Sequence, residues 1–131
     1  MYHEVIISLA SNCDQEQNLS HARLCLERVL SVCRFTETIW TEPISSHLPP
    51  LTSHPSPPTP KYLNQLLRAK SAFPAAALQQ YLKSVERHLG RTDEDRRQGI
   101  VRIDLDLLQH DGQRYHLADW ERPYVQALIN M

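Results

Sequence analysis

The chain has 131 residues, of which 41% are hydrophobic and 22% are charged, a composition typical of a soluble globular domain. Fourteen Lys and Arg residues against fifteen Asp and Glu residues give a net charge of −1, which excludes the strongly basic surface of a duplex-DNA-binding domain. The longest apolar runs, such as residues 5–7 and 75–78, are too short to cross a bilayer.

These bounds predict one domain over residues 1–131, with no nucleic-acid partner and no membrane partner. The first residues are apolar over only a short stretch and lack the basic start of a signal peptide, so we expect a cytoplasmic location. Nothing in the sequence indicates the oligomeric state.

The first half of the chain predicts a strand, a helix and a second strand. Residues 2–9 are centred on a Val-Ile-Ile run that is typical of a strand. Asn12 or Asp14 then begins a helix, whose apolar residues recur at steps of three and four. They are Leu19, Ala22, Leu26, Val29 and Cys33. Residues 35–41 alternate and are rich in β-branched and aromatic side chains, which predicts the second strand.

Residues 44–60 differ in kind from the rest of the chain. They contain six prolines and none of Gly, Asp, Glu, Lys or Arg. Proline fixes φ and removes a backbone donor, so this segment is predicted to be an extended loop. We expect it to close over a substrate site, with a proline-rich recognition segment as the alternative.

The second half predicts a strand, a helix and another strand. Residues 62–72 form the strand, and Pro74 lies in the first turn of the helix. The buried face of this helix is expected to consist of Leu78, Leu82, Val85 and Leu89, with Gly90 at its end. Residues 101–107 alternate as a strand, Asp111-Gly112 is a tight-turn signal, and residues 115–117 are expected to pair back as a short return strand. The order strand, helix, strand, strand, helix, strand predicts an α+β, ferredoxin-like fold, with an antiparallel sheet and two main helices on one face.

Two aspartates in the last strand are the strongest chemical signal. Side chains two apart share a face of a strand, so Asp104 and Asp106 should lie side by side, about 6.6 Å apart along the chain. Arg102 should share that face. Hard carboxylate oxygens suit Mg²⁺, which completes its shell with water and phosphate. The alternative is a solvated strand face on which Arg102 neutralises one acid.

Residues 86–99 are rich in arginine and lead towards the aspartate strand. Guanidinium groups match phosphate oxygens, so an arginine segment beside a magnesium site is suited to phosphoryl transfer. The interspersed acids could equally pair with these arginines on a solvated loop. No Walker A sequence occurs in the chain, so a nucleotide would have to be held in another way.

Several short motifs, in this order along the chain, resemble those of the 6-hydroxymethyl-7,8-dihydropterin pyrophosphokinase family of folate biosynthesis. Residues 7–12 (Ile-Ser-Leu-Ala-Ser-Asn) resemble its apolar-Gly-Ser-Asn, and residues 40–43 (Trp-Thr-Glu-Pro) its Thr-x-Pro turn. Residues 62–64 resemble its Tyr-Leu-Asn, and Glu86 with Gly90 and Arg91 its Glu-x-x-x-Gly-Arg. Residues 104–106 resemble its Asp-hydrophobic-Asp, and His116 followed by residues 121–125 (Glu-Arg-Pro-Tyr-Val) its ending.

The resemblance implies a ferredoxin-like fold and transfer of diphosphate from ATP, with two Mg²⁺ ions, to a hydroxymethyldihydropterin, giving AMP. It implies that Asp104 and Asp106 bind both ions. We also expect Arg91 and Arg102 to act in catalysis, Arg102 because it should share the strand face of the two aspartates and could reach a transferring phosphate. The residues it places along the nucleotide are Glu86, Arg91, His116 and Arg122. The residues it places around the pterin are Thr41, Pro43, Tyr62, Asn64 and Tyr124.

Some positions depart from the family pattern. The family has Pro-Arg-Thr before the aspartate pair, whereas this chain reads Ile-Val-Arg over residues 100–102, so the arginine is displaced by one place. Gln98 stands where a tryptophan is common, Ala10 replaces a glycine, and the sequence ends at Met131, where the family continues. These departures support an alternative, a catalytically impaired pterin- or nucleotide-binding domain, or a regulatory domain, of the same fold.

Overall fold

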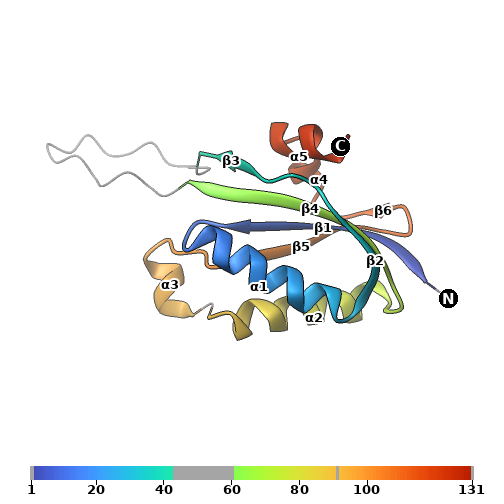
Figure 1. Cartoon of the computed structure of the whole chain (residues 1–131), viewed down its shortest axis with the longest axis horizontal. Helices are drawn as coiled ribbons and strands as arrows, with labels where there is room; N and C mark the ends of the chain where they lie inside the picture. The colour runs from blue at the N-terminus through green and yellow to red at the C-terminus, as the bar shows by residue number, and fades with distance from the viewer. Residues whose placement is uncertain (1, 43–60, 91, 131) are drawn as a thin grey trace, which may run out of the picture.

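The computed structural model describes residues 2–42, 61–90 and 92–130, and its centre is an antiparallel six-stranded sheet. The strands are β1 (His3–Ser11), β2 (Leu30–Phe35), β3 (Ile39–Thr41), β4 (Tyr62–Ser71), β5 (Asp104–His110) and β6 (Gln113–Arg114). Their order is β2-β4-β1-β5-β6, and β3 also pairs with β4 (Figure 1). With one long helix after β1 and another after β4, this is the ferredoxin-like arrangement that the sequence predicted.

Two long helices, α1 (Gln15–Glu27) and α2 (Ala75–His88), cover one face of the sheet (Figure 1). The alternating residues Val5, Ile7 and Leu9 of β1 point towards them and are buried. Both helices contribute one apolar face to this core, with Leu19, Ala22 and Leu26 from α1 and Leu78, Leu82 and Val85 from α2. Short α3 (Asp93–Arg97) follows α2. No helix in the described ranges is long and apolar enough to span a membrane.

The other face of the sheet carries a second core under two short C-terminal helices, α4 (Leu117–Trp120) and α5 (Pro123–Ile129) (Figure 1). Alternation along β1, β4 and β5 places one apolar residue of each strand on this face. Together with the helices they form a cluster of Ile6, Leu66, Leu108, Trp120, Val125 and Leu128. The sequence alone predicted no secondary structure for the terminal segment over residues 120–131, because each of these helices is too short to show a clear 3.6-residue period.

The predicted boundary between the first helix and the second strand was wrong. Helix α1 ends at Glu27, and β2 already begins at Leu30, so Cys33 lies in a strand rather than in a helix. Val29 and Cys33 continue the helical spacing by coincidence. Val32 has φ 51°, and the pairing of β2 with β4 shifts beside it, so β2 is an irregular edge strand without a clean alternation. The predicted strand over 35–41 is therefore divided between β2 and β3.

Strand β5 begins at Asp104, three residues later than predicted. The preceding segment is tied to Asn12 instead of continuing the strand: the Asn12 N–H donates to the Val101 carbonyl at 2.8 Å, and the Val101 N–H donates to Asn12 Oδ1 at 2.6 Å. The alternation from Ile103 onwards still holds, because Ile103, Leu105 and Leu107 are buried in the core under α1 and α2. Asp104 and Asp106 consequently face the side of α4 and α5.

The turn between β5 and β6 is the one that Asp111-Gly112 predicted. Both residues have positive φ, 48° and 84°, as the hairpin turn that suits strand twist requires. The return strand is β6 at Gln113–Arg114, not residues 115–117, although the Tyr115 N–H still donates to the Leu108 carbonyl at 2.9 Å.

Candidate functional site

A pocket of about 180 Å³ lies on the sheet face that carries α4 and α5. It is lined by β1 and β5, by β4 and β3 with the residue after β3, and by the C-terminal segment of α4 and α5. The lining residues are Ser8, Ala10, Thr41, Glu42, Tyr62, Asn64, Asp104, Asp106, Asp119, Arg122 and Tyr124. The pocket thus joins seven of the residues singled out from the sequence, from four separate parts of the chain.

The two aspartates form the floor of this pocket next to small side chains. The β1–β5 register pairs Asp104 with Ala10 and Asp106 with Ser8, so neither carboxylate is covered by a bulky cross-strand neighbour. Both aspartates are half-buried. Two hard carboxylate ligands on one face, open to a pocket, form the donor set that Mg²⁺ uses when phosphate and water complete its shell.

Two basic side chains approach Asp106. Lys83 Nζ lies 3.6 Å and His116 Nε2 lies 3.7 Å from Asp106 Oδ1. His116 precedes α4 with φ 53°, a left-handed conformation that directs the chain from β6 into the helix. The sequence analysis predicted His116 but missed Lys83. The available signal was its position three residues before Glu86, on the same face of α2.

Glu86 is only 2% exposed and lies at the edge of β5 rather than in the pocket lining. Its Oε2 accepts the Leu105 N–H at 2.8 Å and lies 3.1 Å from Lys83 Nζ. Lys83 Nζ also donates to the Leu105 carbonyl at 3.3 Å. Lys83 and Glu86 of helix α2 therefore form hydrogen bonds with the backbone carbonyl and N–H of Leu105, which lies between the two aspartates of β5. In this structure Glu86 positions the aspartate strand.

Asn64 is held between β3 and β4 and is 3% exposed. Its Nδ2 donates to Thr41 Oγ1 at 2.8 Å and to the Ile39 carbonyl at 3.1 Å. Thr41 itself pairs with Tyr62 across the two strands. A buried amide fixed from two sides presents one defined orientation, as recognition of the edge of a heterocycle requires.

The third wall consists of Tyr124, Arg122 and Asp119. Arg122 Nε donates to Asp119 Oδ1 at 2.7 Å, three residues earlier in the chain. Burial, followed by the negative charge of Asp119, raises the pKa of Tyr124 to about 12, so its phenol stays neutral. Tyr124 thus offers an aromatic face and a neutral hydroxyl. Asp119 was missed in the sequence, although its spacing from Arg122 is that of a helical ion pair.

Arg102 does not share the face of the two aspartates, and this expectation was wrong. It precedes the first residue of β5, so strand alternation does not set its direction. Its Nε donates to Asp95 Oδ2 at 2.8 Å, which raises the pKa of the guanidinium. A Cβ at Gly90 would lie 3.2 Å from Arg102 Cδ, so the bare glycine, at φ 103°, leaves room for this side chain. Arg102 does not line the pocket.

Three further expectations fall outside the described residues. They concern Pro43, Arg91 and the predicted loop over 44–60.

Comparison with known proteins places the chain among folate-synthesis sequences. Residues 6–130 match the family described as 7,8-dihydro-6-hydroxymethylpterin-pyrophosphokinase. A folate synthesis bifunctional protein of Arabidopsis thaliana is 29% identical over 136 residues, which cover 96% of this chain and 26% of the relative. A second Arabidopsis thaliana protein, named as a mitochondrial folate synthesis bifunctional protein, is 29% identical over 133 residues, covering 95% of this chain and 22% of the relative. The chain spans about a quarter of the length of these relatives.

Proposed function

The chain belongs to the 7,8-dihydro-6-hydroxymethylpterin-pyrophosphokinase family, and from this premise we propose that it transfers a diphosphate group from ATP to 6-hydroxymethyl-7,8-dihydropterin in folate biosynthesis. The hydroxymethyl oxygen attacks the β-phosphorus, the bond from that phosphorus to the α–β bridging oxygen breaks, and AMP leaves. The observation that carries the proposal is the pocket in which Asp104 and Asp106 meet Asn64, Thr41 and Tyr124.

The aspartates are proposed to bind the two Mg²⁺ ions that accompany ATP. The half-buried carboxylates of Asp104 and Asp106 face the pocket and fit a hard cation. Bound Mg²⁺ supplies positive charge that offsets the charge on the phosphate oxygens. Lys83 offsets part of the Asp106 charge and His116 lies beside the same carboxylate oxygen, so both are placed to exchange this contact for a phosphate when ATP binds.

The two substrates are assigned to opposite sides of the aspartates. The pterin is placed against Asn64, Thr41, Tyr62 and Tyr124, where a fixed amide and an aromatic face can hold a flat heterocycle; by resemblance Pro43 belongs to this side. The nucleotide is placed on the side of His116 and Arg122, where basic groups approach the pocket. By resemblance Arg91 belongs to the nucleotide side, with Glu86 holding the adjacent strand in place.

The reaction products test this proposal. We expect the purified chain, incubated with Mg²⁺, ATP and the reduced pterin, to form AMP in amounts that match the pterin consumed. Omitting the pterin controls for hydrolysis of ATP. Formation of ADP would identify an ordinary kinase, and it would overturn the proposal of diphosphate transfer.

A catalytically impaired domain that binds the pterin or the nucleotide, or that regulates a partner, is the second candidate. The observation that favours it is the Arg102–Asp95 ion pair, because the arginine closest in sequence to the aspartates is held away from the pocket. This candidate predicts saturable binding of Mg²⁺-ATP or of the pterin without formation of either AMP or ADP.

A cytoplasmic location is also proposed. The free thiols of Cys13, Cys25 and Cys33 support a reducing compartment. Fluorescence microscopy of the full chain with a C-terminal fluorescent protein tests this, and accumulation in an organelle would contradict it.

A further inference from the structure

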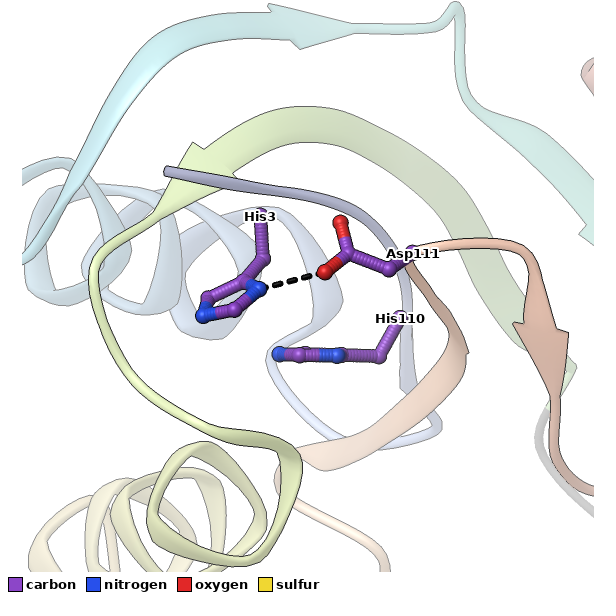
Figure 2. A group of neighbouring side chains, drawn as sticks. All are labelled: His3, His110 and Asp111. Atoms are coloured by element: carbon purple, nitrogen blue, oxygen red, sulfur yellow. Dashed lines mark hydrogen bonds and ion pairs between the residues drawn. The ribbon is translucent and has the colours of Figure 1, made fainter. Parts of the chain in front are cut away.

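Two histidines and an aspartate meet at the end of the sheet that lies away from the pocket. His3 begins β1, His110 ends β5, and Asp111 is the first residue of the β5–β6 turn. The six steps along β5 from Asp104 to His110 span about 20 Å. Figure 2 shows the His3 ring directed at the Asp111 carboxylate, with the His110 ring beside them. This cluster is separate from the substrate pocket.

The three side chains present their ligand atoms to one another. One nitrogen from each histidine and one carboxylate oxygen all lie within 4.8 Å of each other. The two imidazole centroids are 4.5 Å apart, and His3 Nδ1 contacts Asp111 Oδ2 (Figure 2). Around a tetrahedral Zn²⁺ ion the ligand atoms would be about 3.4 Å apart, so shifts of roughly an ångström are enough to close the site.

Backbone groups orient these ligands from outside. Asp111 Oδ1 accepts the Glu4 N–H at 3.0 Å, which leaves Oδ2 directed at His3. His110 Nε2 lies 3.0 Å from the Phe73 carbonyl. A carbonyl oxygen only accepts, so Nε2 carries the hydrogen, and the lone pair of this imidazole is on Nδ1. A histidine fixed in this way by an outer carbonyl is the usual arrangement at protein metal sites.

From this geometry we infer that His3, His110 and Asp111 form a binding site for Zn²⁺. Two neutral imidazoles and one carboxylate are donors that this ion accepts, whereas Mg²⁺ prefers oxygen ligands. The Asp111 side chain is 50% exposed, so water can take the fourth position. The bound ion would join the start of β1 to the β5–β6 turn. This inference does not rest on the proposed transfer of diphosphate.

Zinc titration of tag-free protein tests the site. Isothermal titration calorimetry should show one equivalent of Zn²⁺ bound by the parent chain, and the ion should raise its melting temperature. We expect His3→Gln and Asp111→Asn each to weaken Zn²⁺ binding by at least about tenfold, because each removes one of three protein ligands. His21→Gln, which changes an exposed histidine of α1, is the matched control and should bind Zn²⁺ like the parent.

Two further variants and a spectrum decide the outcome. Asp106→Asn should retain zinc binding, since its carboxylate lies in the other site. Circular dichroism without metal verifies that His3→Gln is folded. If His3→Gln does not fold, Asp111→Asn takes its place in the zinc titration. The visible absorption of bound Co²⁺ should change with His110→Gln. The inference is wrong if the parent binds no Zn²⁺, if folded His3→Gln and Asp111→Asn bind it like the parent, or if only Asp106→Asn loses it.

Discussion

Asp106 is an acidic residue of the pocket that two basic side chains approach. It faces the pocket from β5, and Lys83 and His116 approach one of its carboxylate oxygens from α2 and from the start of α4. The ammonium group of Lys83 offsets part of the negative charge of this carboxylate.

Replacing either aspartate by asparagine should abolish Mg²⁺-dependent binding of ATP. The substitution removes a negative oxygen ligand but preserves shape, so the fold should be unchanged. Calorimetric titration with ATP in the presence and absence of Mg²⁺ measures the effect for Asp104→Asn and Asp106→Asn. Asp93→Asn, which alters an exposed aspartate of α3, is the matched control. If Asp106→Asn binds Mg²⁺-ATP with the affinity of the parent, Asp106 is not a ligand of the Mg²⁺ ions.

Arg102→Ala separates a structural from a catalytic role for this arginine. Asp95 is 7% exposed, so loss of its partner leaves a carboxylate poorly solvated, and we expect a loss of about 1–2 kcal/mol in the free energy of unfolding. AMP formation per folded molecule should fall less than about tenfold. A direct role in transfer would instead lower turnover by roughly 10²-fold at nearly unchanged stability.

Denaturant unfolding and AMP formation on the same preparations measure both quantities. Asp95→Asn is the matched variant, because it breaks the same ion pair from the other side. Similar destabilisation by both substitutions is expected from a structural pair. A hundredfold loss of turnover confined to Arg102→Ala would contradict the structural role.

The phenol of Tyr124 should make stability depend on pH in the alkaline range. Its pKa is raised from 10.0 to about 12 by burial and by Asp119, so the folded state favours the protonated phenol. Its contribution to the free energy of unfolding is complete below about pH 10 and is lost between about pH 10 and 12, where the unfolded chain ionises first. Tyr124→Phe should therefore unfold with a shallower pH dependence than the parent. The free energy of unfolding is measured by denaturant titration at several pH values. An equal dependence of this free energy on pH in the parent and in Tyr124→Phe would contradict the expectation.

At the scale of elements, the site depends on how α2 holds the edge of β5. Glu86→Ala removes the acceptor of the Leu105 N–H and should lower the free energy of unfolding by about 1–3 kcal/mol, since that N–H is left unpaired. It should also weaken Mg²⁺-ATP binding, because Asp104 and Asp106 flank Leu105. Thermal unfolding and ATP titration measure the two effects.

Two comparisons make this test specific. Glu86→Gln keeps an acceptor oxygen and should be milder than Glu86→Ala in both measurements. Glu94→Ala, at an exposed position of α3, should leave both near the parental values. A normal stability of Glu86→Ala would show that the edge of β5 does not need this side chain.

The elements that the sequence predicted well are those with a long and regular period. The spacing of Leu78, Leu82 and Val85 identified α2, and Asp111-Gly112 identified the hairpin turn. The start of β5 was predicted too early because the Asn12 side chain, 89 residues away, takes the place of strand pairing at Val101. Such a long-range contact leaves no periodic signal in the local sequence.

The sequence identified many of the residues that line the pocket, but it did not predict how all of the candidate side chains are directed. Asn64, Asp104 and Tyr124, which the resemblance assigns to the pterin and the metal, line one pocket. Lys83 was not found, since a lysine on a helix ordinarily indicates a solvated face. The direction of Arg102 could not be read from strand alternation, because it is set by the ion pair with Asp95 of α3.

In the molecule as a whole, the two faces of the sheet have different roles: one carries the main core and the other carries the pocket. One face packs against α1 and α2 and supplies the main core, while the other supports α4 and α5, which also form a wall of the pocket. The polar end of this second face carries the aspartates, and the opposite end of the sheet carries the histidine cluster. The C-terminal helices thus contribute both to the second core and to the wall of the candidate site.

Mass spectrometry of the pterin after reaction with Mg²⁺-ATP tests the central claim most directly. Diphosphate transfer predicts a pterin that has gained both the β- and γ-phosphates of ATP, formed by the parent chain and absent with Asp106→Asn. An unmodified pterin, or a pterin that carries a single phosphate, would contradict the account.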